Sequence, residues 1–534
     1  MFQDQMVKEI IIKERESPNN TSFKYVPKNI TDKELQTYYV PRSNGDLVLR
    51  RIRLIDIWRF STEEQRQEMM YYTHLDYIFA QNIFIYMIVF GTETVKMLRN
   101  WGIFNNRSDF IKISKELSTK GKRFIKDIDN WKQKICELAT IVGYMDPAVD
   151  EIDIMEEVYS LAEEGNDHGI NKTKWNKLFE QTVENVMTWY KGHEFKSFEE
   201  YVKEGMWLTS GSSSIGKVEW SMDEEKGHFK ARKNMLMQIY TPEEIYDIAR
   251  KWDGELKSRV FIKNEMSKLR LAVASNIEAY INESYILFLY GHGFKHYFGV
   301  TLDESPTEQH LREVEIIKLL QNGHYGFPFD YASFDHQPTT FEVQTIVKRM
   351  TDIVLSQVPV IAKYETSRIC NLIINGYSKS YLSGNINGVE FDRIKVRGGV
   401  PSGVRITSFL GNMWNSVITK IATDNVKSML GINPFSHISL RGDDVAILSN
   451  NWSALYLLRV SYAAINAIGK DAKLGISPKV IEFLRNEIST EGIRGWTCRG
   501  IGGVSQRKPW NPQPWSPNAE VETICNNIHL LERR

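Results

Sequence analysis

The chain of 534 residues is long enough for about two to four domains or for one large enzyme with several lobes. Hydrophobic residues account for 42% of it and aromatic residues for 12%, which excludes an intrinsically disordered protein. Its 67 basic and 67 acidic residues cancel, so no basic tail indicates an open nucleic-acid-binding surface, although an enclosed basic channel is compatible with this balance.

The cysteines and the apolar stretches exclude further classes of protein. Four cysteines lie far apart and form no Cys-x-x-Cys pair: Cys136, Cys370, Cys498 and Cys525. They provide neither a disulfide framework nor a zinc site, which favours a reducing compartment. The start of the chain lacks a signal-peptide profile, and the most apolar stretch, Tyr77 to Gly91, is too short to span a bilayer. We therefore expect no membrane association, and a buried helix at residues 77–91.

The elements expected along the chain are helices first, then short strands between helices. Residues 1–70 are polar and charge-mixed, as in an extended N-terminal segment that packs on a larger body. From 71 to 205 apolar residues recur at helical spacing, for example over 111–142 and 180–204. Strand-like segments follow at 258–262, 326–330 and 389–396. The centre is therefore α/β or α+β with a small sheet, in one compact multi-lobed unit.

Residues 211–217 spell Gly-x4-Gly-Lys, the start of a phosphate-binding P-loop. The next residue is Val218, whereas a P-loop needs Ser or Thr there to ligate magnesium. Residues 219–223 also make a poor first helical turn. The sequence thus disfavours a P-loop NTPase.

A basic segment covers residues 263–270. Lys268 and Arg270 are two residues apart, so in an extended strand they point the same way, and the segment that begins with Lys263 can clamp a triphosphate. The alternative is a solvated charged hairpin.

Two acids, Asp330 and Asp335, follow a strand-like run and precede a helix that opens near residue 338. A carboxylate at a strand end is well placed to face another carboxylate on a neighbouring hairpin. The alternative is that Asp330 is only a residue on the approach to that helix.

A glycine-rich loop at 397–403 precedes a long helix whose apolar stripe is Ile406, Phe409, Leu410, Met413, Val417 and Ile421. Such a loop presents backbone N–H groups to an anion or a sugar. An ordinary loop with Ser402 near the helix N-cap is the alternative.

Gly442-Asp443-Asp444 lies between the apolar runs 437–440 and 445–448 and predicts strand, tight turn and strand. Adjacent carboxylates about 4 Å apart repel by roughly 4 kcal/mol at an effective dielectric near 20. A divalent cation would offset this repulsion, and together with Asp330 the two acids would form an oxygen site for two cations. An exposed acidic hairpin turn is the alternative.

The order of these clusters resembles the right-hand palm of viral RNA-dependent RNA polymerases. Asp330 and Asp335 match the family's first palm motif. The second motif is matched by Ser402, Gly403 and Thr407, and the third by Gly442, Asp443 and Asp444. The resemblance implies an α+β right hand of fingers, palm and thumb, with a small antiparallel palm sheet flanked by helices. It also implies that Asp330, Asp443 and Asp444 hold two Mg²⁺ ions, with Mn²⁺ as an alternative. Lys263, Lys268 and Arg270 would then bind the NTP triphosphate, and Asp335, Ser402 and Thr407 would recognise the ribose 2′-OH.

Further segments look similar to the same family. Lys479, in 475–479, resembles the fourth-motif lysine that protonates departing pyrophosphate, and residues 482–485 resemble the primer-grip hairpin. The resemblance assigns template or primer RNA to Thr209, Ser210, Gly211, Gly403, Phe483, Leu484 and Arg485. The endings 492–496 and 507–510 look like the picobirnavirus and partitivirus polymerases of double-stranded RNA viruses.

One position departs from the family pattern. Where the family has an asparagine that senses the 2′-OH, four residues after the second-motif threonine, this chain has Gly411. Asn412 lies about 100° further around the helix and Asn415 about 6 Å further along it. Asn412 is therefore only a weak candidate for this role, and sugar selection is expected to depend on Asp335 and Ser402.

The resemblance also implies a domain layout and a biological setting. We expect an N-terminal segment (1–70), fingers (71–275, with a template loop at 209–217 and the NTP clamp at 263–270), palm (276–345), a fingers insertion (346–395), palm again (396–486), and thumb with the C-terminal segment (487–534). The expected partners are template and nascent RNA, NTPs and a viral capsid protein, for a monomer in the virion interior or host cytoplasm. A reverse transcriptase, a non-enzymatic RNA-binding or capsid-associated protein, and a P-loop NTPase are the rivals; the first usually has an aromatic residue at the position of Asp335.

Overall fold

The computed structural model describes residues 2–13, 22–41, 47–124, 131–146, 152–188, 192, 194–209, 212–222, 225–470 and 475–507, and isolated positions between 518 and 528. The fold is mixed α and β, with small and mostly antiparallel sheets, as the sequence predicts.

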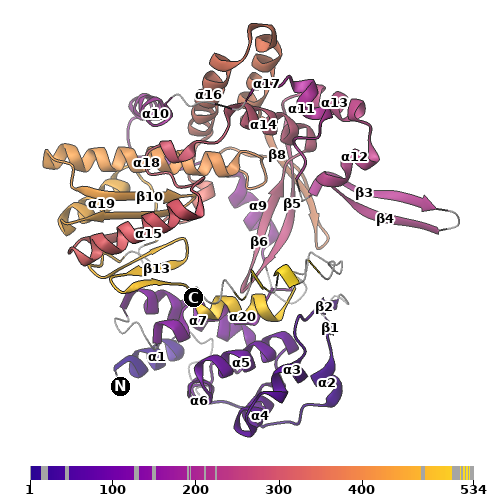
Figure 1. Ribbon diagram of the computed structural model, residues 1–534, viewed down its shortest axis with the longest axis vertical. Coiled ribbons are helices and arrows are strands. Elements are labelled where there is room, and N and C mark those ends of the chain that lie inside the picture. Colours follow the sequence, from indigo (N-terminus) through magenta and orange to yellow (C-terminus); the bar gives the residue numbers. More distant parts are fainter. Residues whose placement is uncertain are drawn as a thin grey trace.

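A three-stranded antiparallel sheet lies at the centre of the left half of Figure 1. Its strand order is β10-β11-β7, with β7 at Tyr325–Asp330, β10 at Phe435–Arg441 and β11 at Asp444–Ser449. The β10–β11 hairpin is the strand, turn and strand that the sequence predicts, and Gly442 adopts the left-handed φ of 60° that the turn requires.

Both faces of this sheet are covered, which explains the unbroken apolar run of β11. Val445 and Ile447 pack into the large core that includes helices α18 (Thr407–Leu430) and α19 (Trp452–Ala464). Ala446 and Leu448 face the other way, against α15 (Pro306–Gln321) and the small sheet β12 (Val480–Phe483), β13 (Asn486–Ser489) and β14 (Gly492–Arg494). Alternate residues of one strand are therefore buried on opposite sides.

A second sheet, of order β6-β5-β8-β9, lies beside the first (Figure 1). Its strands are β5 (Leu256–Glu265), β6 (Lys268–Ala274), β8 (Ser380–Ile386) and β9 (Val389–Lys395), and only β5 and β8 run parallel. Helices α14 (Ile277–Tyr290), α16 (Thr340–Gln357) and α17 (Lys363–Gly376) pack together above it. The segments predicted as strands at 258–262, 326–330 and 389–396 correspond to β5, β7 and β9.

The N-terminal third is helical and has its own core, at the bottom of Figure 1. Its α-helices are α1 (Phe2–Lys13), α2 (Asp32–Gln36), α3 (Leu54–Arg59), α4 (Glu63–Met69), α5 (Tyr77–Phe90), α6 (Thr92–Asn100), α7 (Arg107–Phe124) and α8 (Gln133–Ile135), and a short ladder joins β1 (Tyr39–Pro41) to β2 (Leu47–Leu49). α5 is the predicted buried helix. The late helix α20 (Thr497–Ser505) contributes Cys498 and Ile501 to this core, so the two ends of the chain pack together. Among the described residues, no helix is both long and apolar enough to cross a membrane.

Between these parts lie α9 (Ile154–Ala162), α10 (Lys172–Val186), α11 (Phe198–Lys203), α12 (Leu236–Ile239) and α13 (Pro242–Arg250). The strands β3 (Ser212–Met222) and β4 (Glu225–Arg232) form an antiparallel ribbon that projects from the body (Figure 1). The Gly-x4-Gly-Lys segment continues into strand β3 and not into a helix, so it lacks the geometry of a P-loop.

Candidate active site

Three carboxylates meet at one end of the central sheet. Asp330 ends β7 and Asp444 begins β11, and the two residues are direct cross-strand partners. Cβ atoms of such partners lie about 4.5–5.5 Å apart. Asp443 occupies the adjoining turn, where it is exposed. The strand register therefore brings together the acids that the sequence selected from segments more than 100 residues apart.

These carboxylates perturb one another electrostatically. The pKa of Asp444 is raised to about 7, first by burial and then by the charges of Asp443, Glu482 and Asp330. Burial and the charge of Asp443 also raise the pKa of Asp335. Asp335 nevertheless keeps an exposed side chain. A bound cation would relieve this repulsion.

Carboxylate oxygens are the ligands that Mg²⁺ and Mn²⁺ prefer, so the donor set of Asp330, Asp443 and Asp444 fits these ions chemically. The described residues contain no group of three or more His, Cys, Asp or Glu side chains already placed to hold a metal ion. Asp330 instead accepts a charged hydrogen bond from Lys470, with Nζ 3.1 Å from Oδ1. A metal ion bound through this oxygen would compete with Lys470 for Asp330.

Lys470 is fixed beside Asp330 by the backbone. Its N–H donates to the Asp330 carbonyl at 2.8 Å, and the N–H of Ala332 donates to the carbonyl of Ile468 at 2.9 Å. The Gln337 side chain clamps Ile468 from both sides, at 2.8 and 3.0 Å. Sequence reasoning missed Lys470, because a lysine after a glycine carries no pattern of its own.

Lys479 lies immediately before β12. The neighbouring Ser477 pairs with Gly326, four residues before Asp330. At about 3.3 Å per residue, that pairing is roughly 13 Å from Asp330 along the strand. The structure therefore places Lys470 in contact with Asp330, whereas the backbone next to Lys479 pairs further along the strand.

Two buried asparagines of α18 hold the acidic turn. Asn412 Oδ1 accepts the N–H of Gly442 at 3.0 Å, and Asn415 Nδ2 donates to the Gly442 carbonyl at 2.8 Å. Asn415 Oδ1 also accepts the Tyr331 hydroxyl at 3.0 Å. Asn412, considered above for sugar recognition, is thus engaged with the turn. At Gly411 an added Cβ would lie 3.2 Å from the Phe334 ring, so that ring fills the adjoining space.

The loop at 397–406 packs between the acids and β6. Val400 N–H donates to the Asp335 carbonyl at 2.7 Å, and Ser402 Oγ accepts the N–H of Val273 at 3.3 Å. At Gly403 a Cβ would lie 1.6 Å from the Val273 carbonyl oxygen, so only glycine allows this approach. The Thr407 hydroxyl lies 2.8 Å from the carbonyls of Pro401 and Val404, where it closes the loop on itself. Ser402 itself is exposed.

The three basic residues of the predicted triphosphate clamp lie on the β5–β6 hairpin, and all pair with one carboxylate. Lys263, Lys268 and Arg270 approach Glu265 to 3.2, 3.6 and 3.3 Å respectively. Burial, and then the charge of Arg270, lower the pKa of Lys268 to about 8. Arg270 also acts on Asp335, where its charge lowers the pKa of that acid. The hairpin therefore carries a cluster of cations on the side of Asp335.

The residues expected to contact template or primer RNA lie in separate parts of the structure, and some of them lie outside the described residues. Thr209 Oγ1 lies 2.7 Å from the Tyr280 hydroxyl, while Ser210 and Gly211 lie outside the described residues, as do residues 508–510. Phe483 is buried beneath the Arg312 guanidinium. Leu484 and Arg485 form the β12–β13 turn with left-handed φ values of 52° and 64°, and the charge of Arg485 reaches Asp444.

Comparison with known proteins gives a family for this chain. A model of the family described as viral RNA-directed RNA polymerase matches residues 58–504. The crystal structure of the RNA-dependent RNA polymerase of a human picobirnavirus is similar, with a TM-score of 0.46 and 13% identity over 72% of this chain and 70% of that chain. Its insertion-loop deletion mutant has a TM-score of 0.45 and 12% identity over 72% of each chain. A structure of the segmented genome and RNA polymerase complex inside a double-stranded RNA virus covers 51% of this chain and 25% of that chain, with 16% identity and a TM-score of 0.35. A search of curated proteins found no match.

Proposed function

The chain belongs to the viral RNA-directed RNA polymerase family, and we propose that it extends RNA on an RNA template by transferring a nucleotidyl group from an NTP to the RNA 3′-OH. The family match confirms the viral polymerase that the order of the motifs predicts. The cross-strand pair of Asp330 and Asp444, with Asp443 in the adjoining turn, is the observation that supports this chemistry most directly.

In the proposed reaction the acids Asp330, Asp443 and Asp444 hold two Mg²⁺ ions, or Mn²⁺. When bound, such a pair of ions supplies activation of the attacking oxygen and charge stabilisation at the leaving pyrophosphate. Asp330 leaves Lys470 to take part. The role of the acids is to gather negative charge that attracts and holds these cations.

Lys263, Lys268 and Arg270 bind the triphosphate by exchanging Glu265 for phosphate oxygens. Phosphate accepts several charge-assisted hydrogen bonds from such a cluster, so the exchange is favourable. Their position on the side of Asp335 orients the NTP with its ribose towards Asp335 and Ser402. Asp335 accepts a hydrogen bond from the 2′-OH, which distinguishes this site from a reverse transcriptase.

A lysine of the 468–479 segment donates a proton from Nζ to the departing pyrophosphate. The family resemblance assigns this role to Lys479, whereas Lys470 is the lysine in contact with Asp330. Comparison of the Lys470→Ala and Lys479→Ala variants in single-turnover incorporation distinguishes the two assignments, because loss of the donor slows the chemical step itself.

The wider setting is part of the same proposal. We infer that the sheet β10-β11-β7 with α18 and α19 is the palm, and that 1–70, 71–275, 346–395 and 487–534 are the N-terminal segment, fingers, fingers insertion and thumb. RNA template, nascent RNA and NTPs are the proposed ligands. The enzyme would act as a monomer in replication and transcription of a double-stranded RNA genome, with a capsid protein as partner, in the virion interior or the host cytoplasm.

Incorporation of labelled NTPs on a short RNA template, with and without a primer, tests the proposal. We expect metal-dependent product from the wild type, and a loss of at least about 100-fold in the Asp443→Ala variant because the acids act as one unit. Chelation of divalent metal should abolish the product. No product from the wild type in either format, or preferential use of dNTPs, would contradict the proposal.

A further inference from the structure

Helix α14 places a fully buried carboxylate behind the 397–406 loop. Glu283 is 0% exposed, and its Oε2 accepts the backbone N–H of Arg405 at 2.7 Å. Its Oε1 accepts the hydroxyl of Tyr377, which follows α17, at 3.0 Å. The proposed reaction uses neither Glu283 nor Tyr377.

The hydrogen bond to Arg405 lies at the start of α18. The first N–H groups of a helix have no partner within the helix, and a carboxylate placed there is stabilising. The N-cap residue of α18 is Ile406, whose side chain cannot accept a hydrogen bond. Glu283 therefore binds, from α14, the backbone of Arg405 immediately before this N-cap. Both Asn412 and Asn415, which hold the acidic turn, are carried by this helix.

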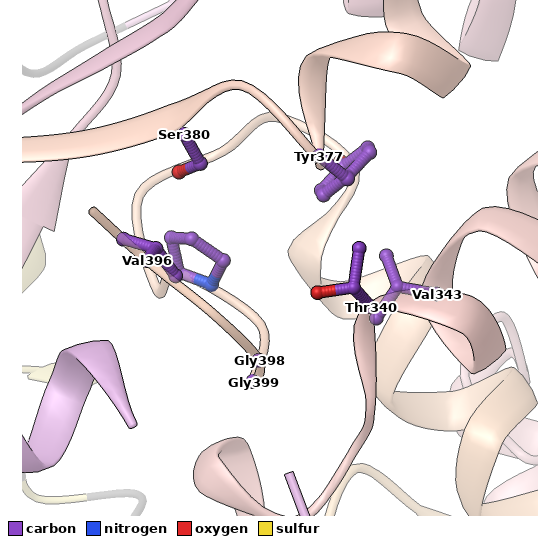
Figure 2. A pocket seen from close by; sticks show the side chains of 8 residues that line it. Thr340, Val343, Tyr377, Ser380, Val396, Gly398 and Gly399 are labelled. Carbon is purple, nitrogen blue, oxygen red and sulfur yellow. The ribbon is translucent and has the colours of Figure 1, made fainter. Parts of the chain in front are cut away.

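The same contact holds the loop that carries Ser402. Beyond Ser402, the carbonyl of Gly403 accepts the Ser275 hydroxyl at 3.2 Å, and Arg405 is bound to Glu283 two residues later. On the other side of the loop is a crevice lined by Thr340, Val343, Tyr377, Ser380, Val396, Gly398, Gly399 and Pro401. Figure 2 shows Tyr377 and the glycines on opposite sides of this crevice. Glu283 binds Arg405 of the loop and Tyr377 of the crevice, and it thus connects the loop to the opposite side of the crevice.

Burial of Glu283 disfavours its charged form, whereas the groups in contact with it are hydrogen-bond donors that partly offset this effect. Burial raises the pKa of Glu283 to about 7, while the N–H groups of Arg405 and Ile406, the Tyr377 hydroxyl and the Arg405 charge all act in the opposite direction. Every neighbour named here donates to the carboxylate, so a protonated Glu283 would gain little from them.

We propose that Glu283 is a positioning residue that fixes Ser402, through Arg405 and the start of α18, in the place where it recognises the ribose. This inference rests on the proposed role of Ser402 and Asp335 in sugar recognition. Displacement of the loop then reduces the preference for a ribonucleotide over its 2′-deoxy analogue. A shift of the loop changes the contact between Ser402 and the ribose, so it affects the choice of sugar and not only the overall rate.

The test measures kcat/KM for one NTP and for its 2′-deoxy analogue with the variants Glu283→Ala and Glu283→Gln. Their ratio does not depend on the fraction of folded enzyme, so it separates positioning from a loss of stability. We expect Glu283→Ala to lower the ribo/deoxy ratio about tenfold and Glu283→Gln, which keeps an acceptor oxygen for Arg405, to lower it about threefold. Glu283→Gln decides the test if Glu283→Ala does not fold.

Glu68→Gln is the matched control. Glu68 is also a buried carboxylate bonded to a tyrosine, Tyr72, at 2.7 Å, but it lies in the N-terminal core and pairs with Arg99. Its ribo/deoxy ratio should equal that of the wild type.

Ser402→Ala and Asp335→Ala, measured in parallel, separate failure of this inference from failure of the proposed function. A lowered ratio in these variants with a wild-type ratio in both Glu283 variants would overturn the role of Glu283 alone. A wild-type ratio in Ser402→Ala and Asp335→Ala would overturn the proposed sugar recognition and, with it, this inference.

Discussion

Asp330 interacts with Lys470 through both the backbone and the side chain, and this pairing shows how the site manages its charge. Across the strand pair, the raised pKa of Asp444 reflects burial and the neighbouring carboxylates. The Lys470 ammonium offsets part of that negative charge. In the proposed function a metal ion would therefore compete with Lys470 for Asp330, in a site where the carboxylates repel one another.

Lys470→Ala should make the protein more dependent on metal for its stability. Without Lys470, Asp330 loses the cation that it contacts, so we expect the thermal unfolding midpoint in EDTA to fall by about 1–3 °C. The rise in that midpoint on addition of saturating MnCl₂ should exceed the rise in the wild type, because the ion no longer displaces a lysine. Differential scanning fluorimetry measures both values.

Lys295→Ala is the control for this experiment. Lys295, in a short 3₁₀ helix, is similarly exposed and pairs with Glu308 of α15 at 2.7 Å. This variant should respond to MnCl₂ as the wild type does. An equal response of Lys470→Ala and the wild type would mean that Lys470 does not compete with metal.

At the scale of elements, α18 connects the parts of the site. Glu283 binds Arg405 just before its start, and Asn412 and Asn415 further along it hold the N–H and the carbonyl of Gly442. The acids at the end of β7 and in the β10–β11 turn are thereby fixed relative to the 397–406 loop. A change in the register of this one helix would move the 397–406 loop and the acidic turn together.

Asn415→Ala should slow catalysis because Asn415 holds the acidic turn, although we propose no contact between Asn415 and a substrate. The change removes the hydrogen bond to the Gly442 carbonyl and leaves the buried Tyr331 hydroxyl without this partner. We expect kcat to fall about tenfold while KM for NTP stays within about twofold, since the triphosphate clamp is unaffected. Steady-state kinetics on a primed template provide the measurement.

Asn425→Ala, on the same helix, is the matched control. Asn425 donates to the Ser461 hydroxyl at 3.2 Å, towards α19 and away from the turn. Its kcat should remain near the wild-type value. A wild-type kcat in Asn415→Ala would show that the acidic turn keeps its position without this hydrogen bond.

The elements were predictable where their pattern is local. β5, β7, the β10–β11 hairpin and the buried helix α5 each follow from period, length and turn chemistry within about a dozen residues. Over 111–142 the pattern was less informative: α7 ends at Phe124 and residues Leu138–Val142 form a 3₁₀ helix. Apolar spacing of three and four cannot distinguish these two kinds of helix over one turn.

At the scale of the whole molecule, distant segments complete one another. The N-terminal core takes in Cys498 and Ile501 from α20, and a buried ion pair joins Lys132 to Glu487 of β13 at 2.9 Å. Both side chains of that pair are at most 5% exposed, so neither charge has water to replace its partner. The N-terminal helices and the β12–β14 sheet are therefore held together by polar as well as apolar contacts.

Lys132→Met should destabilise the protein strongly, because Glu487 is left as an unpaired buried charge. Removing one partner of such a pair costs about 3–5 kcal/mol, whereas replacing both by apolar residues costs far less. The double variant Lys132→Met/Glu487→Leu should therefore recover most of the lost thermal stability. Thermal unfolding followed by circular dichroism compares the three proteins.

Lys120→Met provides a surface comparison for this prediction. Lys120 and Glu116 pair one helical turn apart on α7, where both are about one third exposed. Loss of this pair should cost less than about 1 kcal/mol. If Lys132→Met were no more destabilising than Lys120→Met, the buried pair would not be what joins the two parts.

The sequence by itself determined which acids, glycines and basic residues form motifs, their order along the chain and the family that this order resembles. These features are local: each motif is complete within a few residues, and its turn or strand chemistry acts within the same window. Only the tertiary structure decided that Asp330 pairs with Asp444, that Lys470 contacts Asp330, and that Asn412 is engaged with the acidic turn. The physical reason is that side-chain partners separated by tens or hundreds of residues are selected by strand register and helix packing, for which no single stretch of sequence contains the information.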